Sequence, residues 1–185
     1  MFSLGRLLER VWLQYFSTPA AVRPLVGAIA SKAIRSMVEI GIADTGRTRK
    51  LWDALAVRGE NLPLKYTGID PFESRSKSQP ALPIKQAYSE LRRSGVQVKL
   101  VPGDAATALH RTANSLTGTD LLIISATIGE SELARAWTWM PRMLHAGTII
   151  FQEVRGAGGK SDWQRLSIVE IQQRAKESGK RKKAA

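Results

Sequence analysis

The chain contains no cysteine, and histidine is scarce, with only His110 and His145 among its 185 residues. The lack of cysteine excludes disulfides, thiolate metal sites and cysteine nucleophiles, and two histidines leave little for transition-metal binding. We therefore expect no metal site. No apolar run reaches the roughly 18 to 20 residues that span a membrane, and the N-terminus carries no clear signal-peptide pattern. We expect a cytoplasmic protein.

Acidic residues are also few, 16 against 28 lysines and arginines, which gives a formal net charge of +12. Such a charge attracts polyanions through a salt-dependent field. Four basic residues form the run Lys180 to Lys183, and the others are scattered along the chain. A solvated basic surface accounts for this distribution. We therefore expect at most weak binding of nucleic acid or anionic lipid, through the surface and the tail, and the sequence leaves open whether the protein forms a homodimer.

Hydrophobic residues make up 43% of the chain, enough for the core of one ordinary domain. Apolar strands are expected near residues 37–40, 66–69, 98–101, 121–125 and 148–152, with helices near 46–58, 83–93, 105–112, 131–144 and 162–177. Strands that alternate with helices indicate a parallel sheet covered on both faces. We predict an α/β, doubly wound and mainly parallel sheet of about five strands in the order 3-2-1-4-5.

The N-terminal residues 1–35 are predicted to form a separate helical segment. An amphipathic helix is expected over residues 3–16, and a second one over 19–33. The first could pack on the domain or a partner subunit, anchor at a membrane surface, or cover the active site. Residues 36–177 would form the Rossmann-like domain, and 178–185 a basic disordered tail.

The segment 36–48, SMVEIGIADTGRT, combines an apolar strand, a glycine-rich turn and a helix start. Gly41 and Gly46, with Ala43 between them, let the backbone turn sharply and let a ligand approach the helix N-terminus. A second short strand ends in Asp70, 24 residues after Gly46, where such folds recognise ribose hydroxyls. The pattern predicts a nucleotide-type cofactor.

The charges at this turn distinguish between cofactors. Glu39 closes the first strand and Asp44 lies within the turn, where a dinucleotide would place its pyrophosphate. Like charges a few ångströms apart in a partly desolvated cleft repel strongly. S-adenosylmethionine (SAM) carries no phosphate and brings an ammonium and a sulfonium, so we expect SAM as the cofactor.

Residues 36–154 resemble the class I SAM-dependent methyltransferases. VEIGIADTG is similar to that family's first motif, GIDPF to its second and VPGDAATAL to its third, and TDLLIISAT and HAGTIIFQE are similar to the fourth and fifth strand motifs. The resemblance implies that Asp70 accepts hydrogen bonds from the ribose, that Asp104 contacts the adenine amino group and that Ala105 packs beside the ring. The predicted cofactor-binding residues are Glu39, Gly41, Ala43, Asp44, Gly46, Asp70, Asp104, Ala105 and Ser125.

The chain departs from the family in three places. Ser125 stands where metal-dependent small-molecule O-methyltransferases carry an aspartate that binds a divalent cation, and serine is a poor ligand for such an ion. No DPPY or NPPY sequence follows it. The chain also ends soon after the helix expected at 162–177, without room for the strand hairpin that usually completes the family's sheet.

Methyl transfer needs positioning, desolvation and, for a weak nucleophile, a general base. Glu130 and Glu153 follow the fourth and fifth strands and are the weak candidates, although both could be ordinary helix-start or loop acids. We predict a SAM-dependent methyltransferase with an unknown acceptor. The alternatives are a non-catalytic binding protein with a degenerate methyltransferase fold and an NAD-dependent oxidoreductase.

Overall fold

The computed structural model describes residues 23–29, 32–56, 64–156 and 161–184. Its centre is a six-stranded sheet in the order β3-β2-β1-β4-β5-β6. The neighbours from β3 to β5 pair in parallel, and β6 pairs antiparallel with β5. The strands are β1 (Ser36–Ile40), β2 (Leu64–Asp70), β3 (Val96–Pro102), β4 (Thr119–Ile124), β5 (Leu144–Arg155) and β6 (Ser161–Leu166). The predicted order 3-2-1-4-5 is confirmed, and a sixth strand extends it.

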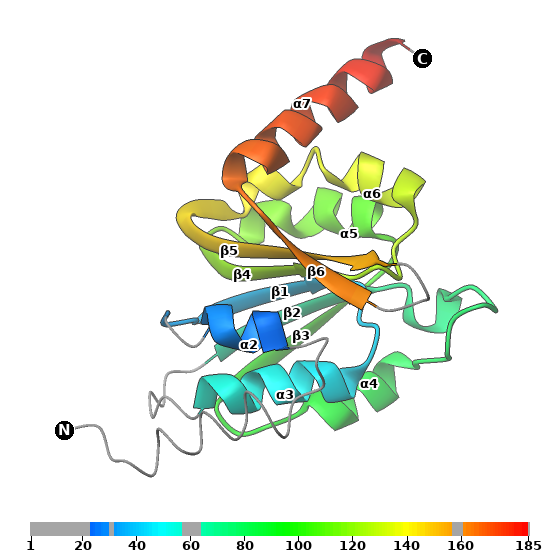
Figure 1. Ribbon diagram of the computed structural model, residues 1–185. Coiled ribbons are helices and arrows are strands. Elements are labelled where there is room, and N and C mark those ends of the chain that lie inside the picture. Colours follow the sequence, from blue (N-terminus) through cyan, green and yellow to red (C-terminus); the bar gives the residue numbers. More distant parts are fainter. Residues whose placement is uncertain (1–22, 30–31, 57–63, 157–160, 185) are drawn as a thin grey trace.

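Helices cover both faces of the sheet (Figure 1). Three of them, α2 (Arg23–Ile29), α3 (Thr45–Ala56) and α4 (Ile84–Leu91), lie on one face. On the other face lie α5 (Ala105–Thr112), α6 (Glu130–Ala136) and the start of α7 (Ile168–Ala184). The short 3-10 helices η3 (Phe72–Ser74), η4 (Ala113–Ser115) and η5 (Met140–Arg142) lie in the connections. The chain is therefore the three-layered doubly wound fold that the alternation predicts.

Burial follows the position of each strand in the sheet. The central β4 contributes Leu121 to Ile124, all fully buried, because helices cover it on both sides. The edge strand β3 instead alternates, and its Gln97 and Lys99 are exposed. Two apolar cores result, one on each face of the sheet.

Two predicted helices differ from the structure. Residues 162–166, expected at the start of a helix over 162–177, belong to β6, where Trp163 pairs with Glu153 of β5. The apolar spacing of Trp163 and Leu166 fits a helix equally well, and only pairing with β5 decides between the two. The expected number of five strands is therefore one too few, because a single antiparallel strand, β6, lies between β5 and α7. The helix expected at 131–144 ends at Ala136, and the next turn is η5, which contains Pro141.

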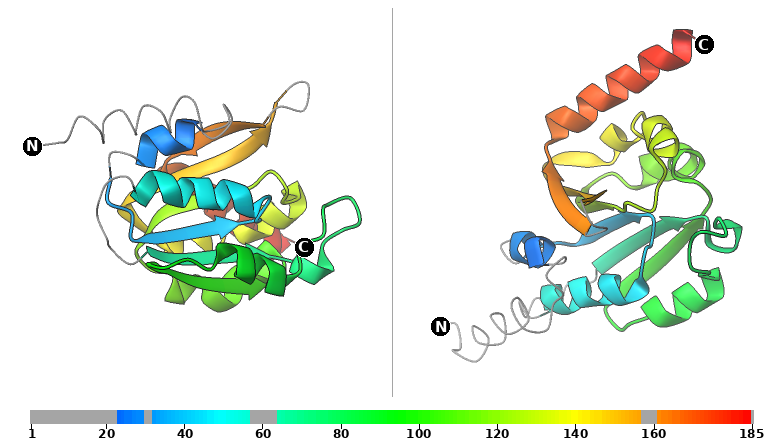
Figure 2. Two further views of the ribbon diagram at one scale, coloured as in Figure 1. Left: turned by 90° about the horizontal axis from the view of Figure 1, so that it is seen from below. Right: turned by 45° about the vertical axis from the view of Figure 1, so that its right-hand side comes forward.

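The two ends of the chain frame this domain. In α2, Leu25 and Ile29 are fully buried against the core, whereas the amphipathic helix expected at 3–16 lies outside the described residues. At the other end, the first turn of α7 places Ile171 in the core, and the helix then projects away from the sheet (Figure 2). Its helical backbone continues to Ala184, through residues expected to be a disordered tail.

Candidate functional site

The carboxyl ends of the parallel strands meet at one edge of the sheet, where doubly wound folds bind their ligands. A small cavity of about 30 Å³ lies there. Gly41 follows β1, Asp70 ends β2 and Ala105 opens α5 after β3, and all three line it. Residues from the other side of the edge, Thr127 and Glu132, close it. Three sequence-predicted residues from separate motifs are therefore brought together.

Gly41 makes the turn that bounds the cavity. Its φ is +78°, a conformation that favours glycine, and its N–H donates to the carbonyl of Ile69 over 2.8 Å. A Cβ at this position would lie 2.8 Å from Thr127 Oγ1 and 3.0 Å from Ile128 Cγ1. The close approach of these chain segments thus requires glycine.

Asp44 caps the N-terminus of α3 rather than facing the cavity. Its Oδ1 accepts a hydrogen bond from the Gly46 N–H at 2.9 Å, and its carbonyl accepts from the Arg47 N–H at 3.1 Å. The carboxylate is exposed, and Ala43 beside it is half-buried. The helix N-terminus that would hold a pyrophosphate is therefore already occupied by the chain's own carboxylate.

Glu39 lies behind the turn, fully buried. Its carboxylate accepts hydrogen bonds from Arg47 at 2.7 Å, Thr48 Oγ1 at 2.7 Å and the Tyr66 hydroxyl at 2.9 Å. Burial, together with the negative charge of Glu39, raises the pKa of Tyr66 well above its ordinary value. The expectation from the sequence used the charges of both Glu39 and Asp44, but Arg47 compensates the charge of Glu39, so the charge argument against a pyrophosphate rests on Asp44.

Arg47 joins this group to the end of β5. Its Nη1 donates to Glu153 at 3.0 Å, and the same Glu153 oxygen accepts from Ser125 Oγ at 3.1 Å. Burial lowers the pKa of Arg47, but the Glu39 and Glu153 carboxylates outweigh it and hold the pKa above the ordinary value. The guanidinium also lies 5.3 Å from the ring centre of Trp163. The guanidinium of Arg47 thus links the Glu39 carboxylate of β1 to the Glu153 carboxylate of β5.

The Asp70 carboxylate accepts four hydrogen bonds at the cleft. Its oxygens accept from the backbone N–H groups of Ile42 at 3.0 Å and Phe72 at 2.8 Å. They also accept from Arg75, with Nε at 2.7 Å and Nη2 at 2.8 Å. The side chains of this ion pair are only 3% and 6% exposed. Asp70 thus holds the turn after β1, the chain after β2 and a buried arginine together.

The end of β3 carries the third predicted motif. Asp104 caps α5 by accepting from the Thr107 N–H at 3.1 Å, and this contact with Thr107 lowers its pKa. The neighbouring Ala105 N–H donates to Glu132 Oε1 at 2.6 Å. The Glu132 carboxylate of α6 therefore already accepts the hydrogen bond of the first backbone N–H of α5.

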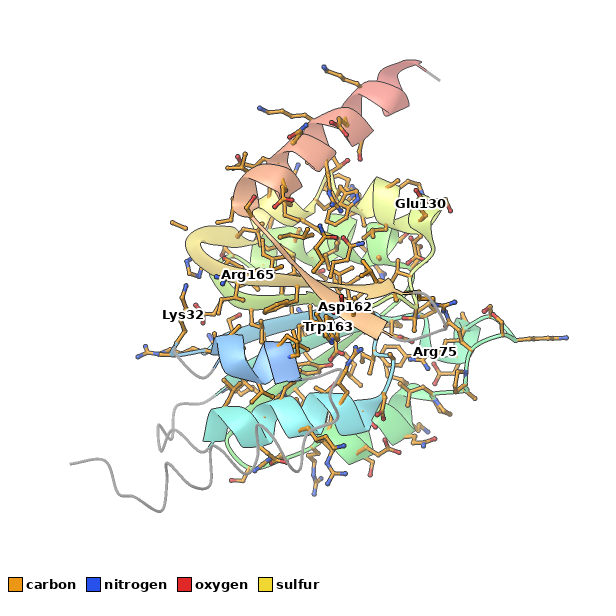
Figure 3. All side chains as sticks on the ribbon, in the orientation of Figure 1. Lys32, Arg75, Glu130, Asp162, Trp163 and Arg165 are labelled. Atoms are coloured by element: carbon orange, nitrogen blue, oxygen red, sulfur yellow. The ribbon has the colours of Figure 1, made fainter. Side chains whose placement is uncertain are left out.

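The two candidate bases lie in different surroundings. Glu130 is exposed at the start of α6, at the same end of the sheet as Arg75 but on another element (Figure 3). It borders a groove between α6 and α7 together with Trp137 and Arg174, not the cavity. Glu153 is partly buried, with its side chain 11% exposed, and contacts Ser125 and Arg47. Ser125 itself is 2% exposed, and its hydroxyl also accepts from the Thr127 N–H at 3.2 Å.

Sequence reasoning missed four residues that shape the site: Arg47, Arg75, Gln79 and Glu132. Several of their partners are far away in the chain, such as Glu153, which is 106 residues from Arg47, and Thr127, which is 48 residues from Gln79. A buried acid at the end of β1 could have indicated a nearby cation, because an unpaired carboxylate is costly in a core.

Within the described residues, no three His, Asp or Glu side chains lie close enough together to hold a metal ion. The same part of the chain holds no helix long and apolar enough to cross a membrane.

The sequence matches no family model and no curated protein. Solved structures with a similar fold include several methyltransferases. MycE methyltransferase of the mycinamycin biosynthetic pathway, in complex with Mg and S-adenosylhomocysteine (SAH), is 17% identical with a TM-score of 0.45, over 82% of this chain and 35% of MycE. Human N-acetylserotonin methyltransferase in complex with SAM is 15% identical with a TM-score of 0.47, over 94% of this chain and 50% of that chain.

A third structure is precorrin-6y C5,15-methyltransferase from Geobacter metallireducens GS-15. It is 13% identical, with a TM-score of 0.46, over 85% of this chain and 71% of that chain. The present chain thus spans about a third of MycE and half of the human enzyme. The likeness to all three is one of fold.

Proposed function

We propose that the protein is a SAM-dependent methyltransferase that binds the nucleoside half of SAM at the carboxyl ends of β1, β2 and β3. The observation that carries this proposal is the convergence of Gly41, Asp70 and Ala105 on one cavity. Asp70 would accept hydrogen bonds from the ribose hydroxyls. The Ala105 N–H would donate to the adenine edge, with Asp104 beside it.

The position of Asp44 favours SAM over a dinucleotide. Because its carboxylate caps α3 at Gly46, a pyrophosphate at that helix end would meet a fixed negative charge instead of free N–H donors. A ligand that carries an ammonium and a sulfonium and no phosphate is favoured by this feature.

When bound, SAM supplies an activated methyl group that leaves by in-line displacement. The chain's own residues would position the donor and exclude water. Among the described residues that line the cavity, the carboxylates are Asp70 and Glu132, and both already accept hydrogen bonds. The proposal therefore assigns no general base, and Glu130 and Glu153 stay candidates.

The proposal is tested by isothermal titration of the full chain with SAM, SAH and NAD. We expect micromolar affinity for SAM or SAH, and NAD binding weaker by about tenfold or more. Equal or tighter binding of NAD would favour the oxidoreductase alternative. A mass-spectrometric screen for transferred methyl groups then separates an enzyme from a non-catalytic SAM-binding protein.

A further inference from the structure

One segment, residues 71–83, runs from the end of β2 to the start of α4 over the mouth of the cavity, and we call it the strap. It is anchored at both ends by buried side chains, Phe72 and Leu82. Between these anchors most residues are exposed, and only Arg75 and Gln79 are half-buried. The strap is thus held by two apolar anchors and two inward-facing polar side chains.

Arg75 takes all of the remaining acceptor capacity of Asp70. A carboxylate offers about four acceptor sites on its two oxygens. At Asp70, two of these bind the N–H groups of Ile42 and Phe72, and the other two bind Nε and Nη2 of Arg75. A ribose diol that binds Asp70 must therefore displace Arg75, because no acceptor site is left for both.

The same guanidinium ties the strap to the glycine turn. Arg75 donates to the carbonyl of Ile42, just after Gly41, and to the carbonyl of Pro80 within the strap at 2.9 Å. The Pro80 contact lies within the strap, so movement of Arg75 away from Asp70 would break only the contact to Ile42. One side chain therefore holds the strap against the glycine turn.

Further contacts close the cavity. Gln79 Nε2 donates to the Thr127 carbonyl at 2.9 Å, across the cavity from the strap. At its other end, Glu132 accepts from the Ala105 N–H. The space left measures about 30 Å³, whereas sites for small molecules commonly measure about 300 to 1,000 Å³. The polar groups that would recognise a nucleoside are bound to the protein's own side chains.

The backbone has an unusual conformation at the start of the strap. Phe72 has a φ of +49°, which is rare for an aromatic residue. This conformation is held by the Asp70 contact to its N–H and by its buried ring. Strain of this kind is typical of segments that change conformation at binding sites.

We propose that Arg75 acts as a latch, that is, a side chain that competes with the ligand for Asp70. An adenosine-type ligand then binds only when Arg75 dissociates from Asp70 and the strap moves outward. The proposal rests on the proposed function and adds its regulation. The closed strap lowers the apparent affinity by the fraction of molecules that are open. Removal of the latch must therefore tighten binding, which is the opposite of what loss of a ligand-contacting arginine does.

The test is titration of SAH into the full chain and into Arg75→Ala. We expect Arg75→Ala to bind SAH about threefold or more tightly than the wild type. Lys77→Ala is the matched control, because Lys77 is an exposed cation on the same strap and its loss should leave the affinity unchanged. Gln79→Ala, which removes the contact to Thr127 but no charge, should also tighten binding. A thermal melt of each variant shows that it is folded.

A second measurement reports on the strap itself. Tryptic cleavage after Lys77, followed by mass spectrometry, should be faster in the wild type when SAH is bound and faster in Arg75→Ala without ligand. Unchanged or weaker SAH binding by Arg75→Ala, or protection of Lys77 by SAH, would overturn the latch and leave the proposed function standing. Failure of both the wild type and Arg75→Ala to bind SAH or SAM would overturn the proposed function, and the latch with it.

Discussion

Arg47 and Glu39 form an ion pair of 2.7 Å inside the domain, with side chains that are 8% and 0% exposed. The two residues are eight positions apart in the sequence, and they meet because α3 begins shortly after the end of β1. The pair connects the glycine turn to Glu153 of β5. The pair therefore joins β1 to β5 beside the strand ends that form the candidate site.

The first prediction concerns this pair. Arg47→Met should lower the free energy of unfolding by about 3 to 5 kcal/mol, because it removes the cation that pairs with the fully buried Glu39. Urea denaturation measures the change. Arg93→Met is the matched control, since Arg93 pairs with Asp53 at the surface, where the side chains are 43% and 49% exposed, and should lose at most about 1 kcal/mol. Equal losses in the two variants would show that the buried pair does not hold the site together.

Asp70 is predicted to bind the ligand, but Arg75 masks its contribution in the wild type. The change is therefore best made in Arg75→Ala, where the latch is absent. In that background, Asp70→Asn should weaken SAH binding by about 1 to 3 kcal/mol, because a charged acceptor for the ribose is lost. Titration calorimetry measures the loss. An unchanged affinity would show that Asp70 only shapes the turn.

Two glycine variants, at Gly41 and Gly95, separate the effect of close packing from the effect of backbone strain. Gly41→Ala places a methyl group 2.8 Å from Thr127 Oγ1 at a φ of +78°. Gly95→Ala has the same φ but meets no atom within 4 Å, so it should lose only about 1 to 2 kcal/mol of stability. We expect Gly41→Ala to lose roughly 1 to 3 kcal/mol more, because the clash adds to the strain, and also to weaken SAH binding. Similar losses in both variants would mean that the approach of Thr127 is not required.

The pH dependence of Tyr66 follows from its burial. Burial and the neighbouring Glu39 raise the pKa of this hydroxyl in the folded state, so the native protein holds its proton more tightly than the unfolded chain. The resulting stability is present below the unfolded value of about 10 and is lost as the pH rises further. Tyr66→Phe should therefore lessen the fall in melting temperature between about pH 9 and pH 11. An identical fall in both proteins would contradict a shifted Tyr66.

The basic end of α7 is expected to be dispensable for the fold. The Ser178 hydroxyl donates to the Ala134 carbonyl at 2.7 Å, and residues 179–185 lie beyond this contact. Their deletion should leave the melting temperature and SAH affinity nearly unchanged. Binding of a single-stranded oligonucleotide should weaken and depend less steeply on salt, because fewer counterions are released. A large drop in melting temperature would show that this segment docks on the domain.

The sequence by itself determined the strands of the parallel sheet and the places where glycine and acids follow them. These features are local, because a buried parallel strand must be apolar throughout and a turn at positive φ favours glycine. The strand order followed from the general topology of doubly wound folds. For the same reason Gly41, Asp70 and Ala105 could be predicted to share one edge of the sheet.

Only the tertiary structure decided what those residues contact. Residues 161–166 form a strand because β5 offers an unpaired edge, although their apolar spacing fits a helix equally well. Arg75 masks Asp70 because the strap folds back over the cleft, and Glu132 reaches Ala105 from a helix 27 residues further along. Ion pairs and hydrogen bonds of this kind depend on which side chains lie close together in the folded protein, and the spacing of residues along the chain does not reveal this.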